Sequence, residues 1–337
     1  MSSHPKGPVL LTGASGFIGA AVMRQLLSAG YEVRAVVRRP GEFHPPPGVE
    51  TCPGDLTDPG SLMAAARGCG AAIHCAADYR LSLRPADTNA MIASNVGGTA
   101  NVLGAARRAG IRRLVYCSTV GTLAFPRSGS WCREGDVARS PSELPGMYKR
   151  SKWAAERLAI DGADGDLEVV VVQPSTPVGS GDHRPTPTGQ TIRDFLRGRI
   201  PAVVETGLNL VAVEAVGRGH VLALERGRTG RSYILGDRNL TLRELLTQVA
   251  RLAGVAPPRW RVPLAAAYAA ALASESLGRL GRQPPAISLT SVRMAAHPMY
   301  VDSGRSQKEL GWQPGDLDEA LRQAVLELGS PRRRRAA

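Results

Sequence analysis

The amino-acid sequence predicts an α/β protein built on a doubly wound parallel sheet, because short apolar runs alternate with helical patterns over its first half. Five runs have the length and aliphatic composition of buried strands, namely PVLLT, EVRAVV, AAIHCA, RRLVYCS and LEVVVVQ. Between them, GFIGAAVMRQLLSAG, DPGSLMAAARG and ASNVGGTANVLGAARRAG carry apolar residues at helical spacing. Such alternation forms right-handed βαβ units, whose helices cover both faces of the sheet.

The composition indicates a cytoplasmic protein with a mostly aliphatic core. The chain has 337 residues with 43% hydrophobic and 4% aromatic content, which suits one large domain or two coupled ones. Residues 1–8 lack the apolar region of a secretory signal. The run Val262–Gly278 is rich in alanine, but Ser274, Glu275 and Ser276 interrupt it, so we expect no membrane span there.

The cysteines and histidines predict neither disulfides nor a metal site. The five cysteines show no CxxC spacing, and none of the six histidines has a cysteine or another histidine four residues away. An odd, scattered set of cysteines is typical of reduced thiols in a cytosolic protein. No zinc-type ligand spacing is visible, so the metal prediction is none.

The positive charge is spread along the chain except at its end. The net charge is +13, and Arg332–Arg335 form the one basic run longer than two residues. We favour a solvated, disordered tail over residues 331–337. The alternative is attraction to anionic phospholipids, which would place the protein at the inner membrane face. No aromatic residues interleave with the basic ones, so no nucleic-acid partner is expected.

A change in composition after Gln173 divides the chain. PSTPVGSGDHRPTPTG is dense in Pro, Gly and Thr and predicts a long irregular segment of the kind that lines binding sites. A helix in QTIRDFLRG, an apolar segment and mainly helical sequence follow. We therefore predict a nucleotide-binding domain over 1–173 and a smaller, mostly C-terminal substrate-binding region over 174–330. A strand near 231–236 is expected to return to the main sheet.

A glycine triplet marks the first strand-to-helix turn as a dinucleotide site. In LLTGASGFIGAAV, Gly13 permits a tight turn, Gly16 lets the backbone approach a pyrophosphate, and Gly19 allows close packing of helix on sheet. The helix N-terminus favours the phosphate charge. The sheet is therefore expected to be Rossmann-like, with cofactor contacts from Gly13, Ser15, Gly16, Phe17, Ile18 and Gly19.

Residues after the next strands indicate which dinucleotide binds. EVRAVVRRP ends its strand in Arg38, where NAD-specific proteins usually place an acidic residue. A guanidinium there suits a 2′-phosphate, so NADP is favoured, with NAD as the alternative. Asp55 and Leu56 are placed to meet an adenine ring, and the small Ala76 and Ala77 allow close approach of the cofactor.

Tyr148 and Lys152 form the candidate proton-transfer pair. Their spacing of four residues puts both side chains on one helix face, and an ammonium beside a phenol favours the phenolate. Together with the positive charge of an oxidised nicotinamide, Lys152 would let Tyr148 move a proton near neutral pH. Thr119 follows the fifth strand and would hold a substrate oxygen. Between the pair, Lys149 and Arg150 are expected to be solvated.

With these motifs, the sequence resembles the extended short-chain dehydrogenase/reductases over essentially its whole length. TGASGFIG, the GDL after the third strand, NVGGT, the hydroxyl pair after the fifth strand, YxxxK and PSTPVG carry the resemblance in that order. It implies a catalytic trio of Thr119, Tyr148 and Lys152, with Lys152 also holding the nicotinamide ribose. It further implies that the backbone around Pro174–Thr176 meets the carboxamide, and that two long helices form a homodimer.

Within this superfamily the sequence is most similar to the hopanoid-associated sugar epimerases, with dihydroflavonol-reductase-like enzymes next. HCAADYRLSLRP, MYKRSKWAAE and QPSTPVGSGDHRPTPTG carry this similarity, whereas Ala212–Ala215 depart from a usual His-Val-Asp-Asp. Asn95 would either tie its helix to the sheet or relay protons. Candidate substrate contacts, each with an alternative role in anchoring a loop, are Asp78, Tyr79, Arg80, His183 and Arg184.

The resulting hypothesis is an NADP-dependent oxidoreductase or epimerase that acts on a sugar-like, small or lipid-linked substrate, in hopanoid side-chain biosynthesis. A ketoreductase would use the same trio but consume NADPH. A non-catalytic dinucleotide sensor would have no need of Tyr148 and Lys152.

Overall fold

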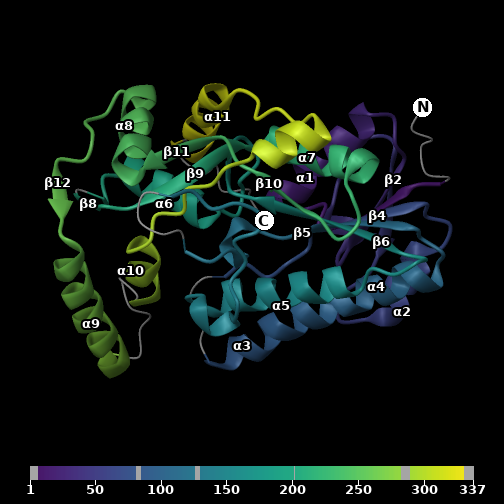
Figure 1. Ribbon diagram of the computed structural model, residues 1–337. Coiled ribbons are helices and arrows are strands. Elements are labelled where there is room, and N and C mark those ends of the chain that lie inside the picture. The colour runs from purple at the N-terminus through teal and green to yellow at the C-terminus, as the bar shows by residue number, and fades with distance from the viewer. Residues whose placement is uncertain (1–6, 81–84, 126–129, 201, 282–288, 330–337) are drawn as a thin grey trace.

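The computed structural model describes residues 7–80, 85–125, 130–200, 202–281 and 289–329 (Figure 1). The basic tail predicted over residues 331–337 lies outside the described residues.

A seven-stranded parallel sheet forms the centre of the molecule and confirms the predicted fold class. Its order is β10-β6-β5-β4-β1-β2-β3, so the direction of winding reverses between β1 and β4. β10 pairs in parallel with β6, which brings a strand from late in the chain into the main sheet. The strands are β1 Val9–Thr12, β2 Val33–Val37, β3 Val49–Pro53, β4 Ala71–His74, β5 Arg113–Cys117, β6 Glu168–Pro174 and β10 Ser232–Leu235.

Helices cover both faces of this sheet, as the alternating pattern predicts. In Figure 1, α4 (Gly98–Arg108) and α5 (Met147–Asp161) lie below the sheet, and α1 (Phe17–Ser28) and α7 (Val213–Arg226) lie above it. Two hydrophobic clusters result, one on each face. α2 (Pro59–Ala66) packs beside α4, and α3 (Pro85–Ile92) leads through a π-helical turn, η2 (Ala93–Gly97), into α4.

The carboxyl edge of the sheet carries three short 3₁₀ turns. η1 (Pro40–Glu42) follows β2, η3 (Val120–Thr122) follows β5, and η4 (Pro141–Glu143) precedes α5.

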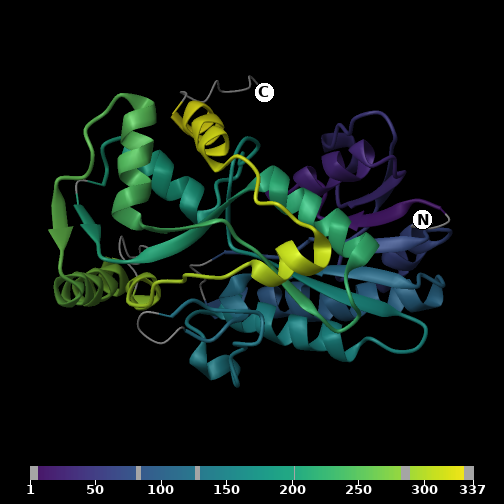
Figure 2. The same ribbon diagram turned by 45° about the horizontal axis from the view of Figure 1, so that its top comes forward.

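The second half of the chain contributes two small sheets and most of the remaining helices (Figure 2). β9 (Gly207–Ala212) lies between β7 (Thr176–Val178) and β11 (Arg238–Thr241), and β8 (Ala202–Val204) pairs with β12 (Trp260–Val262). The helices are α6 Pro187–Leu196, α8 Leu242–Ala253, α9 Leu264–Gly281, α10 Leu289–Ala295, η5 Ser306–Leu310 and α11 Leu317–Gly329.

The prediction of an irregular segment after Gln173 is wrong in part, because β7 lies within it. β7 has only three residues and contains Pro177, so it has too little alternation to show as a strand in the sequence. It is held by pairing with β9, a partner more than thirty residues later in the chain.

Within the described ranges, no helix is both long enough and apolar enough to cross a membrane. The alanine-rich run predicted not to span one forms most of α9.

Candidate functional site

The glycine turn between β1 and α1 has the geometry of a pyrophosphate site. Gly13 has a φ of +80°, and a Cβ there would lie 2.7 Å from the backbone nitrogen of Ala76. A Cβ on Gly19 would collide with the carbonyl oxygen of Gly13. No side chain of the described chain caps the N-terminus of α1, so its first N–H groups are available to an anion. These residues fit a dinucleotide.

Arg38, the residue predicted to meet a 2′-phosphate, is exposed at the end of β2. Within the described part of the chain, no hydrogen bond or ion pair holds its side chain. Its positive charge contributes to lowering the pKa of two carboxyl groups, those of Asp55 and Asp78. Hydrogen bonds from Thr57, with a smaller contribution from Arg38, hold the pKa of Asp55 below its usual value, and Arg80 followed by Arg38 does the same for Asp78. Arg39, by contrast, pairs with Glu42 at 3.2 Å.

Leu56 and the end of β6 complete the candidate cofactor contacts. Leu56 packs on α4, where a Cβ on Gly98 would lie 2.8 Å from the Cβ of Leu56. Pro174 ends β6 at the carboxyl edge, and the hydroxyl of the next residue, Ser175, is buried without a hydrogen-bond partner among the residues described. A buried polar atom without a partner is costly, so Ser175 suits a polar group of a ligand.

Thr119, Tyr148 and Lys152 come together between the end of β5 and the start of α5. The Thr119 side chain lies close enough to the Tyr148 phenol to lower its pKa. Lys152 is 3% exposed, and its Nζ donates to the Tyr116 hydroxyl and to the Cys117 carbonyl, both at 2.7 Å. The helical spacing thus places phenol and ammonium at one edge of the sheet, as the sequence predicts.

Burial changes the expected ionisation of the phenol. It raises the pKa of Tyr148 to about 12, although the charge of Lys152 and the hydrogen bond with Thr119 both lower that pKa. The predicted direction of the Lys152 effect is therefore confirmed, but desolvation is the larger effect in the protein alone. Tyr148 is consequently a protonated phenol near neutral pH.

A series of buried polar side chains begins at the Tyr116 hydroxyl, which holds Lys152 in place. The Tyr116 hydroxyl accepts from Lys152 and has its pKa lowered by the nearby Thr99 side chain, although burial raises that pKa overall, and Thr99 contacts His74 Nε2 at 3.2 Å. His74 Nδ1 in turn lies 2.6 Å from Thr12 Oγ1. Burial, and then the charge of Lys152, lower the pKa of His74 to about 3, so the imidazole is neutral.

Glu156 is a site residue that the sequence analysis missed. It lies one turn beyond Lys152 on α5 and is 1% exposed. Its carboxylate accepts hydrogen bonds from Ser118, from Thr122 at 2.9 Å, and from Gln173 at 3.1 Å. The same Thr122 hydroxyl also lies 2.9 Å from the Thr119 carbonyl oxygen and can donate its one proton to either acceptor, so Glu156 is linked to the backbone that carries the candidate catalytic hydroxyl. Its position four residues after Lys152 was the one available signal in the sequence.

Asn95 ties elements together, the first of its two predicted roles. It is buried in η2, its Nδ2 donates to the Asp78 carbonyl and to Ser151 Oγ, both at 2.9 Å, and its Oδ1 accepts from the Asp78 N–H. Ser151 Oγ donates to the Tyr148 carbonyl. Asn95 thus joins the loop after β4 to the first turn of α5.

Lys149 is half-buried, so the prediction that it is solvated is wrong. Its Nζ lies 5.3 Å from the ring centroid of Phe125, and Phe125 stacks on His297 at 4.2 Å. Burial lowers the pKa of Lys149 to about 8. Lys149 is shielded from water by side chains from distant segments, such as Phe125. The spacing of residues along the sequence cannot show such contacts. The expectation for Arg150 also needs correction, because its guanidinium donates to the Leu144 carbonyl.

The five candidate substrate contacts lie in two segments. Asp78, Tyr79 and Arg80 follow β4, and His183 and Arg184 follow β7. The Tyr79 hydroxyl donates to the Arg184 carbonyl at 3.0 Å, which joins the loop after β4 to the segment after β7. Arg80 pairs with Asp78 and with Asp87. His183 is 83% exposed and lies 2.9 Å from Glu327 of α11. These contacts match the loop-anchoring alternative, and Tyr79 and Arg184 are the two that the structure brings together from distant segments.

Residues Ala212–Ala215, which stand in place of the usual His-Val-Asp-Asp, lie where α7 contacts α1. Ala212 ends β9 and is buried, and Glu214 accepts from Arg24 Nε and from Gln25 Nε2 of α1, both at 2.9 Å. In this chain these positions join α7 to α1.

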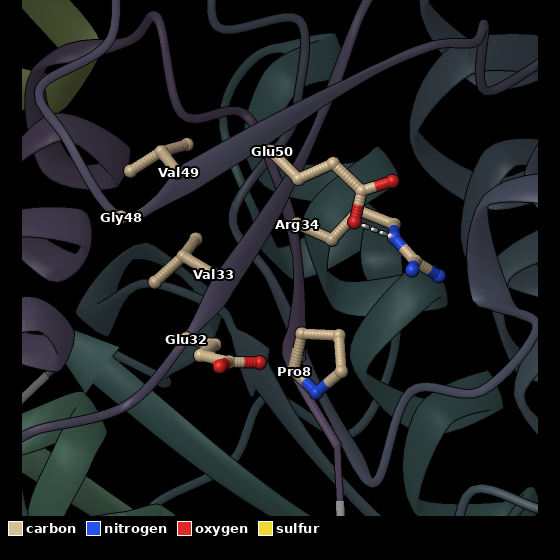
Figure 3. Close-up of a pocket in the computed structure, with 7 residues that line it drawn as sticks. All are labelled: Pro8, Glu32, Val33, Arg34, Gly48, Val49 and Glu50. Atoms are coloured by element: carbon tan, nitrogen blue, oxygen red, sulfur yellow. Dashed lines mark hydrogen bonds and ion pairs between the residues drawn. The ribbon is translucent and has the colours of Figure 1, made fainter.

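A surface depression elsewhere on the sheet is unrelated to this site. Figure 3 shows it at the amino ends of β2 and β3, where Arg34 Nε lies 2.7 Å from Glu50. The glycine turn after β1, Arg38 after β2, Thr119 after β5 and Ser175 after β6 instead follow the carboxyl ends of the strands, where α/β proteins bind their ligands.

Comparison with known proteins identifies the family to which this arrangement corresponds. Residues 9–236 match the model of the NAD dependent epimerase/dehydratase family. A Synechocystis protein with the provisional name dihydroflavonol 4-reductase is 41% identical over 324 residues, which cover 94% of this chain and 92% of that protein.

Two further relatives are similar over nearly their full lengths. Sterol demethylase protein B of Methylococcus capsulatus is 34% identical over 94% of this chain and 96% of its own. The crystal structure of a nucleoside-diphosphate-sugar epimerase from Pseudomonas aeruginosa has a TM-score of 0.76 and 26% identity, with 95% of this chain and 96% of that chain covered.

Proposed function

The chain belongs to the NAD dependent epimerase/dehydratase family, and we propose that it transfers hydride reversibly between NADP and a hydroxylated or sugar-like carbon. It is an NAD(P)-dependent enzyme of the extended short-chain dehydrogenase/reductase type. We assign its substrate to hopanoid side-chain biosynthesis, as a small or lipid-linked molecule. The similarity to a protein named for sterol demethylation supports a polycyclic lipid substrate.

The observation that carries the proposal is that Thr119 and the buried Lys152 both lie close enough to the Tyr148 phenol to lower its pKa. In the reductive direction, the Tyr148 hydroxyl donates its proton to the substrate oxygen, and Thr119 holds that oxygen by a hydrogen bond. In the oxidative direction, Tyr148 accepts the proton. The nicotinamide, when bound, supplies or accepts the hydride. Lys152, anchored on Cys117 and Tyr116, stabilises the phenolate and is placed to contact the ribose.

A labelled cofactor distinguishes the two forms of this chemistry. With NADPH deuterated at the transferred position, a ketoreductase puts deuterium into its product and consumes NADPH. An epimerase inverts a carbon without net consumption, because it returns the hydride to the same carbon. The assay uses nucleotide sugars, cyclic ketones and polar-lipid extract, with mass spectrometry as the readout. Cofactor binding without label transfer or epimer formation in any of these would contradict the proposal and favour a dinucleotide sensor.

Arg38 is expected to determine the preference for NADP. The change Arg38→Ser removes the guanidinium that would pair with the 2′-phosphate, so the Kd for NADPH should rise about tenfold or more, whereas the Kd for NADH stays within about twofold. Fluorescence titration of both cofactors measures this. Arg39→Ser is the matched control, because Arg39 pairs with Glu42. An equal loss for both cofactors would show that Arg38 does not recognise the phosphate.

Lys149 is expected to bind the substrate through its charge. Its ammonium persists below pH 8 and is lost as pH rises through its pKa of about 8, so KM should rise across that range. In Lys149→Met, KM should be high and independent of pH there, while NADPH affinity is unchanged. Steady-state kinetics from pH 6.5 to about 9.5 test this. The exposed Lys308, changed to Met, is the control, and a wild-type-like pH profile for Lys149→Met would contradict the assignment.

A further inference from the structure

Two cysteines and one histidine from three separate elements meet beside the candidate active site. Cys75 follows β4, Cys117 ends β5, and His220 belongs to α7. Their ligand atoms all lie within 4.8 Å of one another. His74 pairs with Tyr116 in the parallel register, so Cys75 and Cys117 come next to each other on the opposite face, which α7 covers.

The hydrogen bonding of His220 directs a lone pair into this cluster. The side chain is fully buried, and its Nδ1 lies 2.8 Å from the Val216 carbonyl oxygen. A carbonyl only accepts, so Nδ1 carries the proton and Nε2 has the free lone pair. Nε2 is buried without a hydrogen-bond partner in the described part of the chain. Histidines that bind metals commonly donate their other N–H to a carbonyl in this way.

We propose that Cys75, Cys117 and His220 form a three-ligand site for a thiophilic divalent cation of the zinc class. Thiolate and imidazole ligands select such ions over magnesium or calcium, and Cys₂His is a known three-ligand set for zinc. Two thiolates balance the charge of the cation, so the occupied site is neutral and its burial is not penalised as an isolated charge would be. The fourth coordination position is open to the Cys75 side, because Cys75 is the half-buried member.

The site would lie next to the proposed chemistry and is independent of the proposed function. The Cys117 carbonyl holds Lys152, and the backbone after Cys75 lies against Gly13. Local spacing could not reveal the cluster, since Cys75 lies 42 residues before Cys117, and Cys117 lies 103 residues before His220.

Cadmium binding to the full-length protein, reduced and without air, tests the site. Cd²⁺ alone is titrated while the near-ultraviolet thiolate-to-metal absorption is followed, and Zn²⁺ is then added as competitor. The expected result is one Cd²⁺ per chain, displaced by Zn²⁺. Cys75→Ser, Cys117→Ser and His220→Gln should each weaken binding at least about tenfold, the scale set by loss of even an outer partner of a metal ligand.

Cys52→Ser is the matched control, because Cys52 is also half-buried in a strand of the same sheet. It should bind Cd²⁺ like the wild type. Far-ultraviolet circular dichroism checks folding, and if Cys117→Ser does not fold, Cys75→Ser and Cys75→Ala carry the test. No absorption with the reduced wild type, full absorption in Cys75→Ser, or its loss in Cys52→Ser would each overturn the proposal.

Discussion

Replacing Tyr148 with phenylalanine is expected to lower kcat by about 10²–10⁴-fold, the contribution typical of one general acid or base. The phenol hydroxyl lies near Thr119 at the carboxyl edge of β5, and phenylalanine retains the ring without this hydroxyl. NADPH affinity should therefore change little. Stopped-flow measurement of NADPH oxidation and a separate binding titration give the two values.

The pH dependence of the wild type follows from the direction of the Tyr148 shift. With its pKa raised to about 12 in the protein alone, Tyr148 is protonated as a general acid, and reduction loses rate only as pH rises toward that pKa. Oxidation, which needs the phenolate, gains rate over the same range. Tyr31→Phe, which removes a hydroxyl that donates to Glu225 near the amino end of β2, is the control. Unchanged turnover in Tyr148→Phe would refute the catalytic assignment.

Replacing Glu156 with leucine is expected to destabilise the protein by about 3–5 kcal/mol, the scale for removing one partner of a buried charged network. Ser118, Thr122 and Gln173 would lose their common acceptor in the interior, and a buried donor without a partner costs about 1–3 kcal/mol. Turnover should fall too, because Thr122 also supports the Thr119 backbone. Urea unfolding followed by circular dichroism measures the stability.

Two variants separate this buried network from a general effect of lost charge. Glu156→Gln keeps the shape and one acceptor oxygen, so it should recover part of the lost stability. Glu205→Leu removes a 78%-exposed carboxylate that pairs with Arg261 and should cost less than about 1 kcal/mol. If Glu156→Leu unfolds at the same urea concentration as Glu205→Leu, Glu156 does not have the structural role assigned to it.

The features that local sequence determines are those in which neighbouring residues act together. The strand–glycine–helix pattern around Gly13 and Gly19 predicts its turn correctly, because backbone conformation and close packing limit those positions to glycine. The helical spacing of Tyr148 and Lys152 likewise places both at one edge of the sheet. Continuous aliphatic strands predict the parallel sheet, since such strands are buried on both faces.

Tertiary structure alone determines the features that depend on contacts between distant segments. β7 exists because β9 pairs with it, and Lys149 is desolvated because Phe125 covers it. Glu156 has its role because Gln173 and Thr122 converge on it. Cys75, Cys117 and His220 meet only when α7 covers the sheet. The physical reason is that burial and charge are set by what surrounds a side chain, and those surroundings come from elsewhere in the chain. The sequence thus determined the turn and the YxxxK face, and the fold decided which of their neighbours are buried, paired or available to a ligand.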